Sequence, residues 1–334
     1  MECKNTYITR DKYEESPEIM VKNGDILFVK TGSTLGKSAL VTRLEEDASI
    51  NPQIVVMRVK EGTEAFMSDI LITQGILKQV AAVRIGGAVP TMTETELKNF
   101  EYFAPTSDKE KMQIGTIFAD IDHLITLHQR KYNKLLNVKK SMLEKMFPKN
   151  GSNIPEIRFK GFTDPWEQRK LTEFVEFFSG LTYTPNDVQK NGTLVLRSSN
   201  VSNGEVVDAD NVYVNPQVVN SENVKVGDIV VVVRNGSRSL IGKHAQIKAF
   251  MPNTVIGAFM TGIRSECPEF TNALLNTSRF EEEIAMNMGA TINQITGYMF
   301  SKMEFKVPCL DEQKKIGSYF ANLDRLITLH QREF

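Results

Sequence analysis

The chain has 334 residues, of which 41% are hydrophobic and 24% are charged, and this balance is typical of a globular protein. That length exceeds what one ordinary hydrophobic core organises, so we expect two domains or more. No apolar run reaches the roughly 18 residues that a membrane-spanning helix needs. The formal net charge is −1, so any contact with nucleic acid must come from cations gathered on one face.

The first region, residues 1–108, mixes strand and helix signals. Residues 26–29 and 54–57 predict strands, and residues 65–84 predict a helix. The turn after the first strand resembles a phosphate-binding loop, but three residues separate Gly32 from Gly36, where that motif requires four. We therefore interpret this turn as a polar loop and rank nucleotide hydrolysis third among the functional hypotheses.

Residues 109–147 carry the clearest helical signal. Apolar residues recur at alternating three- and four-residue intervals, as in the seam of a coiled coil. A helix of this length extends roughly 58 Å, more than a single domain needs, and Pro148 ends it. The seam positions in its first half are Ile114, Phe118, Ile121, Ile125 and His128.

The second region, residues 151–308, is also α+β. Residues 229–233 are all β-branched and predict a strand that is buried on both faces. Residues 194–196 and 254–256 predict further strands, and residues 270–288 predict a helix. A second long helix then follows in residues 309–334.

The second long helix repeats the first. The run Leu124–Arg130 recurs unchanged as Leu326–Arg332, 202 residues later. Two such helices in one chain pair most simply as an antiparallel coiled coil, with a histidine of each helix as a polar seam residue. The duplication extends upstream, but the first region lacks a counterpart to the front of the second, and the final helix is shortened. The second seam is Ile316, Phe320, Leu323, Ile327 and His330.

Polar and basic residues gather in the loops that leave the strands. Arginine reads guanine through two hydrogen bonds, asparagine reads adenine, and serine or lysine contacts phosphate. The equivalent loops differ between the two regions while the helices barely differ, as two readers of different sequences on a repeated spacer would. The candidate DNA-contacting residues are Arg197, Asn200, Arg234, Asn235, Ser237, Arg238, Lys243 and Asn293 in the second region, and Lys30, Thr31, Ser33 and Lys37 in the first.

Residues typical of catalysis or metal binding do not cluster. The four histidines are scattered, and neither Asn51–Gln53 nor Asn215–Gln217 has the Asn/Asp-Pro-Pro-aromatic signature of an adenine methyltransferase. The three cysteines are far apart and form no C-x-x-C pair, which argues against a zinc site and favours a reducing, cytoplasmic setting. We expect no catalytic residue and no metal ligand.

The chain resembles the specificity subunit of type I restriction–modification systems. The resemblance rests on the boundary phrase Phe159–Leu171 and on the repeated helices with their shared Leu-Ile-Thr-Leu-His-Gln-Arg run, and it extends over essentially the whole chain. It implies two target-recognition domains, residues 1–108 (truncated) and 151–308, each reading half of a bipartite site in double-stranded DNA. It also implies two spacer helices, residues 109–150 and 309–334, that form an antiparallel coiled coil.

The same resemblance implies the partners of the chain. Two methyltransferase subunits would dock on the spacer, restriction subunits would join the complex, and no membrane is involved. S-adenosylmethionine, ATP and magnesium would bind to those partners, so we expect no cofactor and no catalytic activity on this chain. The alternative hypothesis is a degenerate half-module that acts as a protein-interaction scaffold without reading DNA, and salt-dependent DNA binding distinguishes the two.

Overall fold

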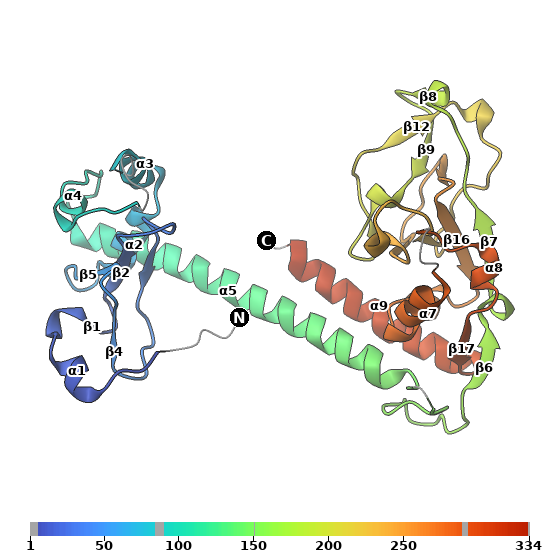
Figure 1. The fold of residues 1–334 in the computed structure, drawn as a ribbon, viewed down its shortest axis with the longest axis horizontal. Coiled ribbons are helices and arrows are strands. Elements are labelled where there is room, and N and C mark those ends of the chain that lie inside the picture. Colours follow the sequence, from blue (N-terminus) through green and yellow to red (C-terminus); the bar gives the residue numbers. More distant parts are fainter. Residues whose placement is uncertain (1–5, 84–89, 150, 289–292, 333–334) are drawn as a thin grey trace. The chain divides into compact units, whose positions relative to one another are not determined.

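The computed structural model describes residues 6–83, 90–149, 151–288 and 293–332. The chain divides into two compact units, unit 1 (Met1–His128) and unit 2 (Gln129–Phe334), and each is described by itself. Both units combine helices with sheets, which confirms the α+β class (Figure 1). Within the described ranges, no helix has the length and apolar character needed to cross a membrane.

Unit 1 is built on a three-stranded antiparallel sheet with β2 in the centre. Side chains alternate between the two faces of β2, and Ile26 and Phe28 lie on the face toward the core, where both are completely buried. Leu71, Ile76 and Val80 of the two following helices pack against them. The elements are α1 (Arg10–Glu14), β1 (Met20–Val21), β2 (Ile26–Val29), β3 (Ser38–Leu40), β4 (Ala48–Ser49), β5 (Ile54–Met57), α2 (Glu64–Leu71), α3 (Gln74–Val83) and α4 (Glu94–Lys98).

Unit 2 contains two four-stranded sheets. The order of the first is β14-β13-β16-β7, and that of the second is β15-β9-β12-β8, in which β15 and β9 run parallel. All four residues of β13 are buried, as the β-branched run predicts. The strands are β6 (Glu167–Lys170), β7 (Val175–Ser179), β8 (Val188–Gln189), β9 (Thr193–Leu196), β10 (Val201–Ser202), β11 (Glu205–Val206), β12 (Val212–Val214), β13 (Ile229–Val232), β14 (His244–Gln246), β15 (Thr254–Ile256), β16 (Met260–Ser265) and β17 (Glu304–Val307).

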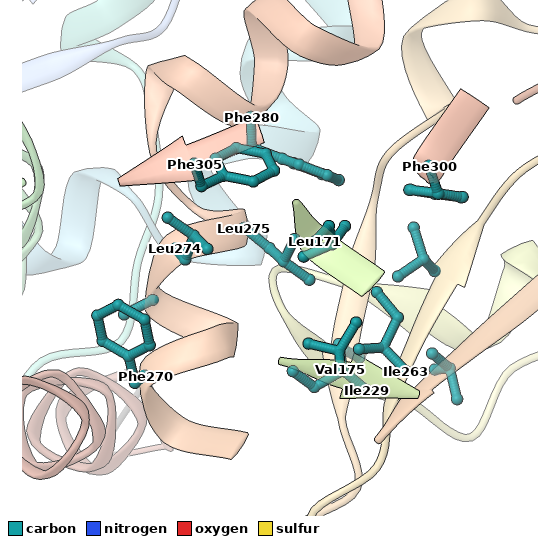
Figure 2. Close-up of a cluster of buried hydrophobic side chains, with 14 of the residues drawn as sticks. Leu171, Val175, Ile229, Ile263, Phe270, Leu274, Leu275, Phe280, Phe300 and Phe305 are labelled. Atoms are coloured by element: carbon teal, nitrogen blue, oxygen red, sulfur yellow. The ribbon is translucent and has the colours of Figure 1, made fainter. Parts of the chain in front are cut away.

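The core of unit 2 lies between the β13–β16–β7 sheet and the helices that follow it. Figure 2 shows side chains of α6 facing Leu171 and Val175, with Ile229 and Ile263 beside them. Trp166, from the boundary phrase, is 1% exposed, and its ring meets the ring of Phe147 edge-on at 5.7 Å. The α-helices of this part are α6 (Pro268–Leu275), α7 (Ser278–Asn287) and α8 (Gly297–Phe300). The short 3-10 helices of the chain are η1 (Pro17–Ile19), η2 (Leu171–Glu173), η3 (Pro185–Asp187), η4 (Ser198–Asn200), η5 (Pro216–Val218) and η6 (Arg238–Leu240).

The two long helices are α5 (Asp108–Met146) and α9 (Leu310–Arg332). Within unit 2, the C-terminal half of α5 runs antiparallel to α9 (Figure 1). Lys139 Nζ lies 2.6 Å from Asp324 Oδ1, and the rings of Phe147 and Phe320 are 6.1 Å apart. Antiparallel pairing of the two helices is therefore confirmed.

The seam residues of the two helices have different surroundings. All five on α9 are at most 9% exposed, and those that join the core pack with Leu135, Val138, Met142 and Leu143 of α5. On α5, Phe118, Ile121 and Ile125 are 49%, 44% and 42% exposed. The expected partner of the α9 seam was the near-identical stretch that begins at Ile114, and this is corrected: within unit 2, the later half of α5 covers the seam.

The predicted helices 65–84 and 270–288 are each broken once, at equivalent places. Thr73 Oγ donates a hydrogen bond to the Ile70 carbonyl at 2.7 Å, and Thr277 Oγ donates one to the Leu274 carbonyl at 2.6 Å. A threonine that bonds a carbonyl three residues back competes with the helical ladder. The structure therefore has two helices, α2–α3 and α6–α7, where periodicity alone predicts one.

The duplication includes details of the two units. The guanidinium of Arg58 bonds Asp25, and that of Arg264 bonds Asp228. Each aspartate also accepts a hydrogen bond from the backbone N–H three residues before it. The strands β2, β3 and β5 thus correspond to β13, β14 and β16, and the helices α2 and α3 correspond to α6 and α7.

Candidate nucleic-acid interface

Three loops of unit 2 that lie far apart in the sequence meet in space. Asn235 Nδ2 donates to Ser198 Oγ at 3.0 Å, and Asn293 Nδ2 donates to the Gly236 carbonyl at 3.0 Å. A backbone bridge joins Arg234 to Gln294. We call residues 197–199, 234–239 and 293–294 the three-loop surface. Two of its loops leave the buried strands β9 and β13, which belong to different sheets.

Arg234 is the best-positioned cation of the three-loop surface. Its side chain is exposed, and its guanidinium carbon lies 5.0 Å from the centre of the Phe259 ring. A guanidinium that stacks on an aromatic ring keeps the N–H donors at its edge, where they can bind a planar acceptor pair such as the guanine edge. Phe259 is itself 55% exposed, so the ring and the guanidinium form one solvent-facing feature.

Some of the neighbouring polar side chains face solvent, and others hold the loops in place. Ser237, Arg238 and Lys243 are exposed, as a DNA-contacting role requires. Asn235 Oδ1 accepts the Ser237 backbone N–H at 2.9 Å, and its amide nitrogen bonds Ser198. Asn235, like Asn293, therefore holds the loops together, and its amide is already committed within the protein.

Asn200 does not belong to the surface, and the expectation that it contacts DNA is corrected. Its side chain is completely buried, and its Oδ1 accepts the Arg197 N–H at 2.9 Å. Its Nδ2 donates to the Ala209 carbonyl at 2.8 Å. Arg197 is half-buried, and its guanidinium bonds Asp210 at 2.6 Å. Both residues thus stabilise the loop that presents Ser198.

A cavity of about 650 Å³ adjoins the three-loop surface. Aromatic, apolar and polar side chains line it, among them Leu181, Tyr183, Arg197, Ser198, Asp210 and Phe259. Sequence reasoning missed Tyr183 and Phe259, because a single aromatic residue in a loop carries no periodic signal. Their contribution to the site is visible only once the loops are placed together.

Lys243 is followed by His244, which is buried and lies in β14. Burial lowers the pKa of His244, and the proximity of Lys139 lowers it further. Its Nδ1 lies 3.0 Å from the Gly242 carbonyl oxygen, so a neutral ring donates a hydrogen bond there. His244 consequently adds no positive charge, and the exposed cations of this side are Arg234, Arg238 and Lys243.

Unit 1 repeats part of this arrangement. Met92 N–H donates to the Lys30 carbonyl at 2.8 Å, as Ile295 N–H donates to the Val233 carbonyl at 2.8 Å. Thr31 and Thr91 form the backbone bridge that corresponds to the one at Arg234. The remaining candidates of unit 1 lie on the same turn: Ser33 and Lys37 are exposed, and Lys30 Nζ lies 3.4 Å from Glu94.

The described residues contain no group of three or more histidine, cysteine, aspartate or glutamate side chains that could hold a metal ion. The geometry of unit 2 instead offers exposed guanidinium and ammonium groups beside hydroxyls and an aromatic ring. Such a set has the donors that phosphates and base edges require, because these ligands present anionic or planar acceptors.

The chain is similar in sequence to a known family of proteins. Residues 163–333 match the model of the type I restriction modification DNA specificity domain. The specificity subunit of the type I restriction enzyme MjaVIII from Methanocaldococcus jannaschii is 24% identical over an alignment of 337 positions, gaps included. The alignment covers 95% of this chain and 76% of that protein.

Two solved structures share the fold. One is the S subunit of a type I restriction–modification system from M. genitalium, with a TM-score of 0.58 and 14% identity over 93% of this chain and 79% of that one. The other comes from work on complex assembly and conformational transition of the type I system, with a TM-score of 0.51 and 16% identity over 94% of this chain and 77% of that one.

Proposed function

The chain belongs to the type I restriction–modification DNA specificity family, and we propose on that basis that it reads the DNA target for a complex of this type. The observation that carries the proposal is the convergence of the three loops in unit 2. Each loop is a candidate from sequence alone, and they meet through the hydrogen bonds of Asn235 and Asn293. The result is one surface with exposed arginines, which is what direct readout requires.

In this proposal, Arg234 reads a guanine and its neighbours hold the duplex in register. Stacking on Phe259 orients the Arg234 fork toward the O6 and N7 acceptors of a guanine in the major groove. Arg238, Ser237 and Lys243 contact phosphate oxygens, which fixes orientation without reading sequence. Unit 1 would read the other half of a bipartite site in double-stranded DNA through Thr31, Ser33 and Lys37, beside Lys30.

The proposed partners supply the chemistry that this chain does not perform. Two methyltransferase subunits would dock on the α5 and α9 helices, and restriction subunits would join that core. S-adenosylmethionine, ATP and magnesium would bind to those subunits, and the complex would work in the cytoplasm, on cellular DNA. The likeness of the fold to a solved structure from work on assembly of a type I system supports the assignment of the partner subunits.

The test compares Arg234→Ala with Arg279→Ala in the full chain, bound to its methyltransferase subunits. Arg279 lies on α7, where it pairs with Glu283, and serves as the matched control. Loss of a bidentate contact costs about 1–3 kcal/mol of discrimination. Arg234→Ala should therefore relax the specificity for one base in one half-site of the methylated motif, while Arg279→Ala should leave the motif unchanged.

Two results would count against the proposal. The first is a methylated motif and DNA affinity that stay the same in Arg234→Ala. The second is DNA binding that does not weaken with salt, because neutralisation of phosphates releases counterions and makes binding salt-dependent. The scaffold hypothesis predicts that second result, and among the described residues no feature favours this hypothesis.

A further inference from the structure

In each unit, one exposed residue stands directly before a strand and is tied by its backbone to the candidate DNA-contacting loop. Before β16 of unit 2 it is Phe259, whose carbonyl accepts the Val233 N–H at 3.0 Å and the Arg234 N–H at 3.2 Å. Before β5 of unit 1 it is Gln53, whose carbonyl accepts the Lys30 N–H at 2.8 Å. Each of these two residues is therefore held beside the loop of its own unit.

The registers of the strands make these two residues equivalent. The last residue pair of β2 with β5 is Val29 with Ile54, and that of β13 with β16 is Val232 with Met260. The residue before β5 thus corresponds to the residue before β16. The neighbouring loop position also changes between the units, because the backbone bridge that Arg234 forms in unit 2 is formed by a threonine in unit 1.

The ring of Phe259 is placed to reach the base pair next to the guanine that Arg234 is proposed to read. A guanidinium that bonds O6 and N7 of a guanine with both arms lies in the plane of that base. Its carbon lies over the Phe259 ring, 5.0 Å from the ring centre. The ring is therefore displaced from that plane along the duplex, in which successive base pairs are about 3.4 Å apart.

The chemistry of the ring selects what it can recognise there. A phenyl ring has no hydrogen-bonding group, and the apolar feature that a base pair presents in the major groove is the 5-methyl group of thymine. The Phe259 ring is 55% exposed, and Leu181, Tyr183 and Met260 line the adjoining cavity with it. These side chains offer an apolar surface that a methyl group can cover.

The equivalent residue of unit 1 has a different chemistry. The side-chain amide of Gln53 has a donor nitrogen for N7 of adenine and an acceptor oxygen for its N6 amino group. The side chain is exposed. Asn51 Oδ1 accepts the Gln53 backbone N–H at 3.0 Å, which fixes the turn that carries this amide. The two units thus offer different base-reading groups at one equivalent position.

We propose that the residue directly before β16 and the residue directly before β5 are the base-reading positions that distinguish the two units. Phe259 packs on the methyl group of a thymine in the base pair next to the guanine, and Gln53 reads an adenine in the other half-site. Both assignments rest on the proposed function and extend it to two residues outside the polar and basic loop candidates. Phe259 orients Arg234 as well, so the experiment has to separate that role from reading.

The test for Phe259 uses the full chain, bound to its methyltransferase subunits, and the motif that this complex methylates. In the half-site that Arg234→Ala relaxes, the guanine should stand next to an A·T pair. Deoxyuridine in place of the thymine of that pair removes one methyl group and should weaken binding about fourfold, as burial of one such group predicts. Phe259→Ala should abolish this difference, and Phe259→Leu, which keeps an apolar side chain, should retain it. The control Phe250→Ala, at a phenylalanine that is 79% exposed, should leave it unchanged.

The test for Gln53 uses the other half-site. Gln53→Ala should relax the specificity for one adenine there. At that adenine, 7-deazaadenine lacks the N7 acceptor and should weaken binding of the natural chain about tenfold, but not that of Gln53→Ala. The control is Gln217→Ala, because Gln217 ends an Asn-Pro-Gln turn of the same kind, in which Asn215 Oδ1 accepts its backbone N–H at 3.0 Å.

Three results would overturn the inference. These are a G·C pair on both sides of the guanine that Arg234 reads, a deoxyuridine effect that persists in Phe259→Ala, and a motif that Gln53→Ala leaves unchanged. The second result, together with weaker discrimination of guanine, would show that the ring only orients Arg234. Failure of the proposed function would look different, because DNA binding by the natural complex would then not depend on salt and Arg234→Ala would leave the motif as it is.

Discussion

Two candidate asparagines of unit 2 use their side-chain amides to hold loops together. Asn200 and Asn235 have the same side chain, but the amide of Asn200 is buried and binds the Ala209 carbonyl beyond the β10–β11 hairpin, while that of Asn235 joins two loops of the three-loop surface. A buried amide must find partners inside the protein, because an unpaired polar group costs about 1–3 kcal/mol. Substitution of either asparagine should therefore act on loop geometry before it acts on the proposed DNA contacts.

His244 makes the stability of unit 2 depend on pH. Burial holds its pKa below the ordinary value of 6.5, so the folded chain stays neutral there while the unfolded chain takes up a proton. The free energy of unfolding should consequently fall as the pH drops below about 6.5. Trp166 is the single tryptophan and is buried in unit 2, so its fluorescence during denaturant unfolding at pH 7.5, 6.5 and 5.5 measures the effect.

The matched variants for this prediction are His244→Gln and His123→Gln. The first removes the titrating group and should flatten the pH dependence, although the chain loses a packed ring beside Phe280. The second alters an exposed histidine of α5 and should leave the dependence as it is. Equal slopes in all three proteins would show that His244 is not the source.

At the scale of elements, each long helix docks on its unit through a glycine. A Cβ on Gly317 would lie 2.7 Å from the backbone nitrogen of Phe270, and one on Gly115 would lie 2.6 Å from that of Phe66. The glycines let α9 approach α6, and α5 approach α2, at backbone distance. This close approach explains why the Ile-Gly pair stands in both copies of the helix.

Gly317→Ala should destabilise unit 2 although alanine favours helices. Overpacking at such a contact costs about 1–3 kcal/mol, which exceeds the gain of up to about 1 kcal/mol in helix propensity. Denaturant unfolding followed by Trp166 fluorescence measures the change. In the control Gly75→Ala, the nearest atom to the new Cβ is 3.9 Å away, and circular dichroism should show unchanged or slightly raised stability. A stabilised Gly317→Ala would refute the close contact.

Ile125 and Ile327 occupy the same position of the repeated run, yet their surroundings differ. Ile327 is 8% exposed and Ile125 is 42% exposed. A charge buried without a partner is strongly destabilising, so Ile327→Asp should lower the free energy of unfolding by about 3–5 kcal/mol. Ile125→Asp should change it by less than about 1 kcal/mol. Thermal unfolding of the isolated chain compares the two, and equal losses would show that both helices bury this position alike.

At the scale of the molecule, the two units each have their own ion pair and their own core. Asp25 and Asp228 are both 1% exposed and both bond an arginine. Neutralising Asp25 leaves Arg58 without its acidic partner, whereas neutralising Asp228 leaves Arg264 with Glu222 at 3.1 Å. Because the guanidinium groups are partly exposed, we expect a cost of up to about 2 kcal/mol. The two substitutions therefore probe the two units independently.

Calorimetry of Asp25→Asn and Asp228→Asn should show which transition belongs to which unit. Asp25→Asn should lower the midpoint temperature of the unit 1 transition and leave the transition followed by Trp166 fluorescence unchanged. Asp228→Asn should lower the midpoint temperature of the transition that Trp166 reports. A single transition that both variants shift equally would mean that the chain unfolds as one cooperative body.

The sequence by itself determined the elements and the duplication. The strands at residues 26–29, 54–57 and 254–256 have the predicted bounds, and the long helix begins within one residue of its predicted start. The repeated run identified two copies of one design and led to the family. These features are local: alternation and helical spacing depend on neighbours in the chain, so they can be read without knowledge of the fold.

Tertiary structure alone decided which candidates form a site and which stretches are covered. Asn200 and Asn235 look alike in sequence, yet the first is completely buried and the second is half-buried. Ile125 and Ile327 stand at the same place of identical runs, yet the first is 42% exposed and the second is 8% exposed. The convergence of Ser198, Arg234 and Asn293 likewise depends on strands of two sheets. Burial and proximity arise from contacts between residues far apart in the chain, and periodicity carries no record of those contacts.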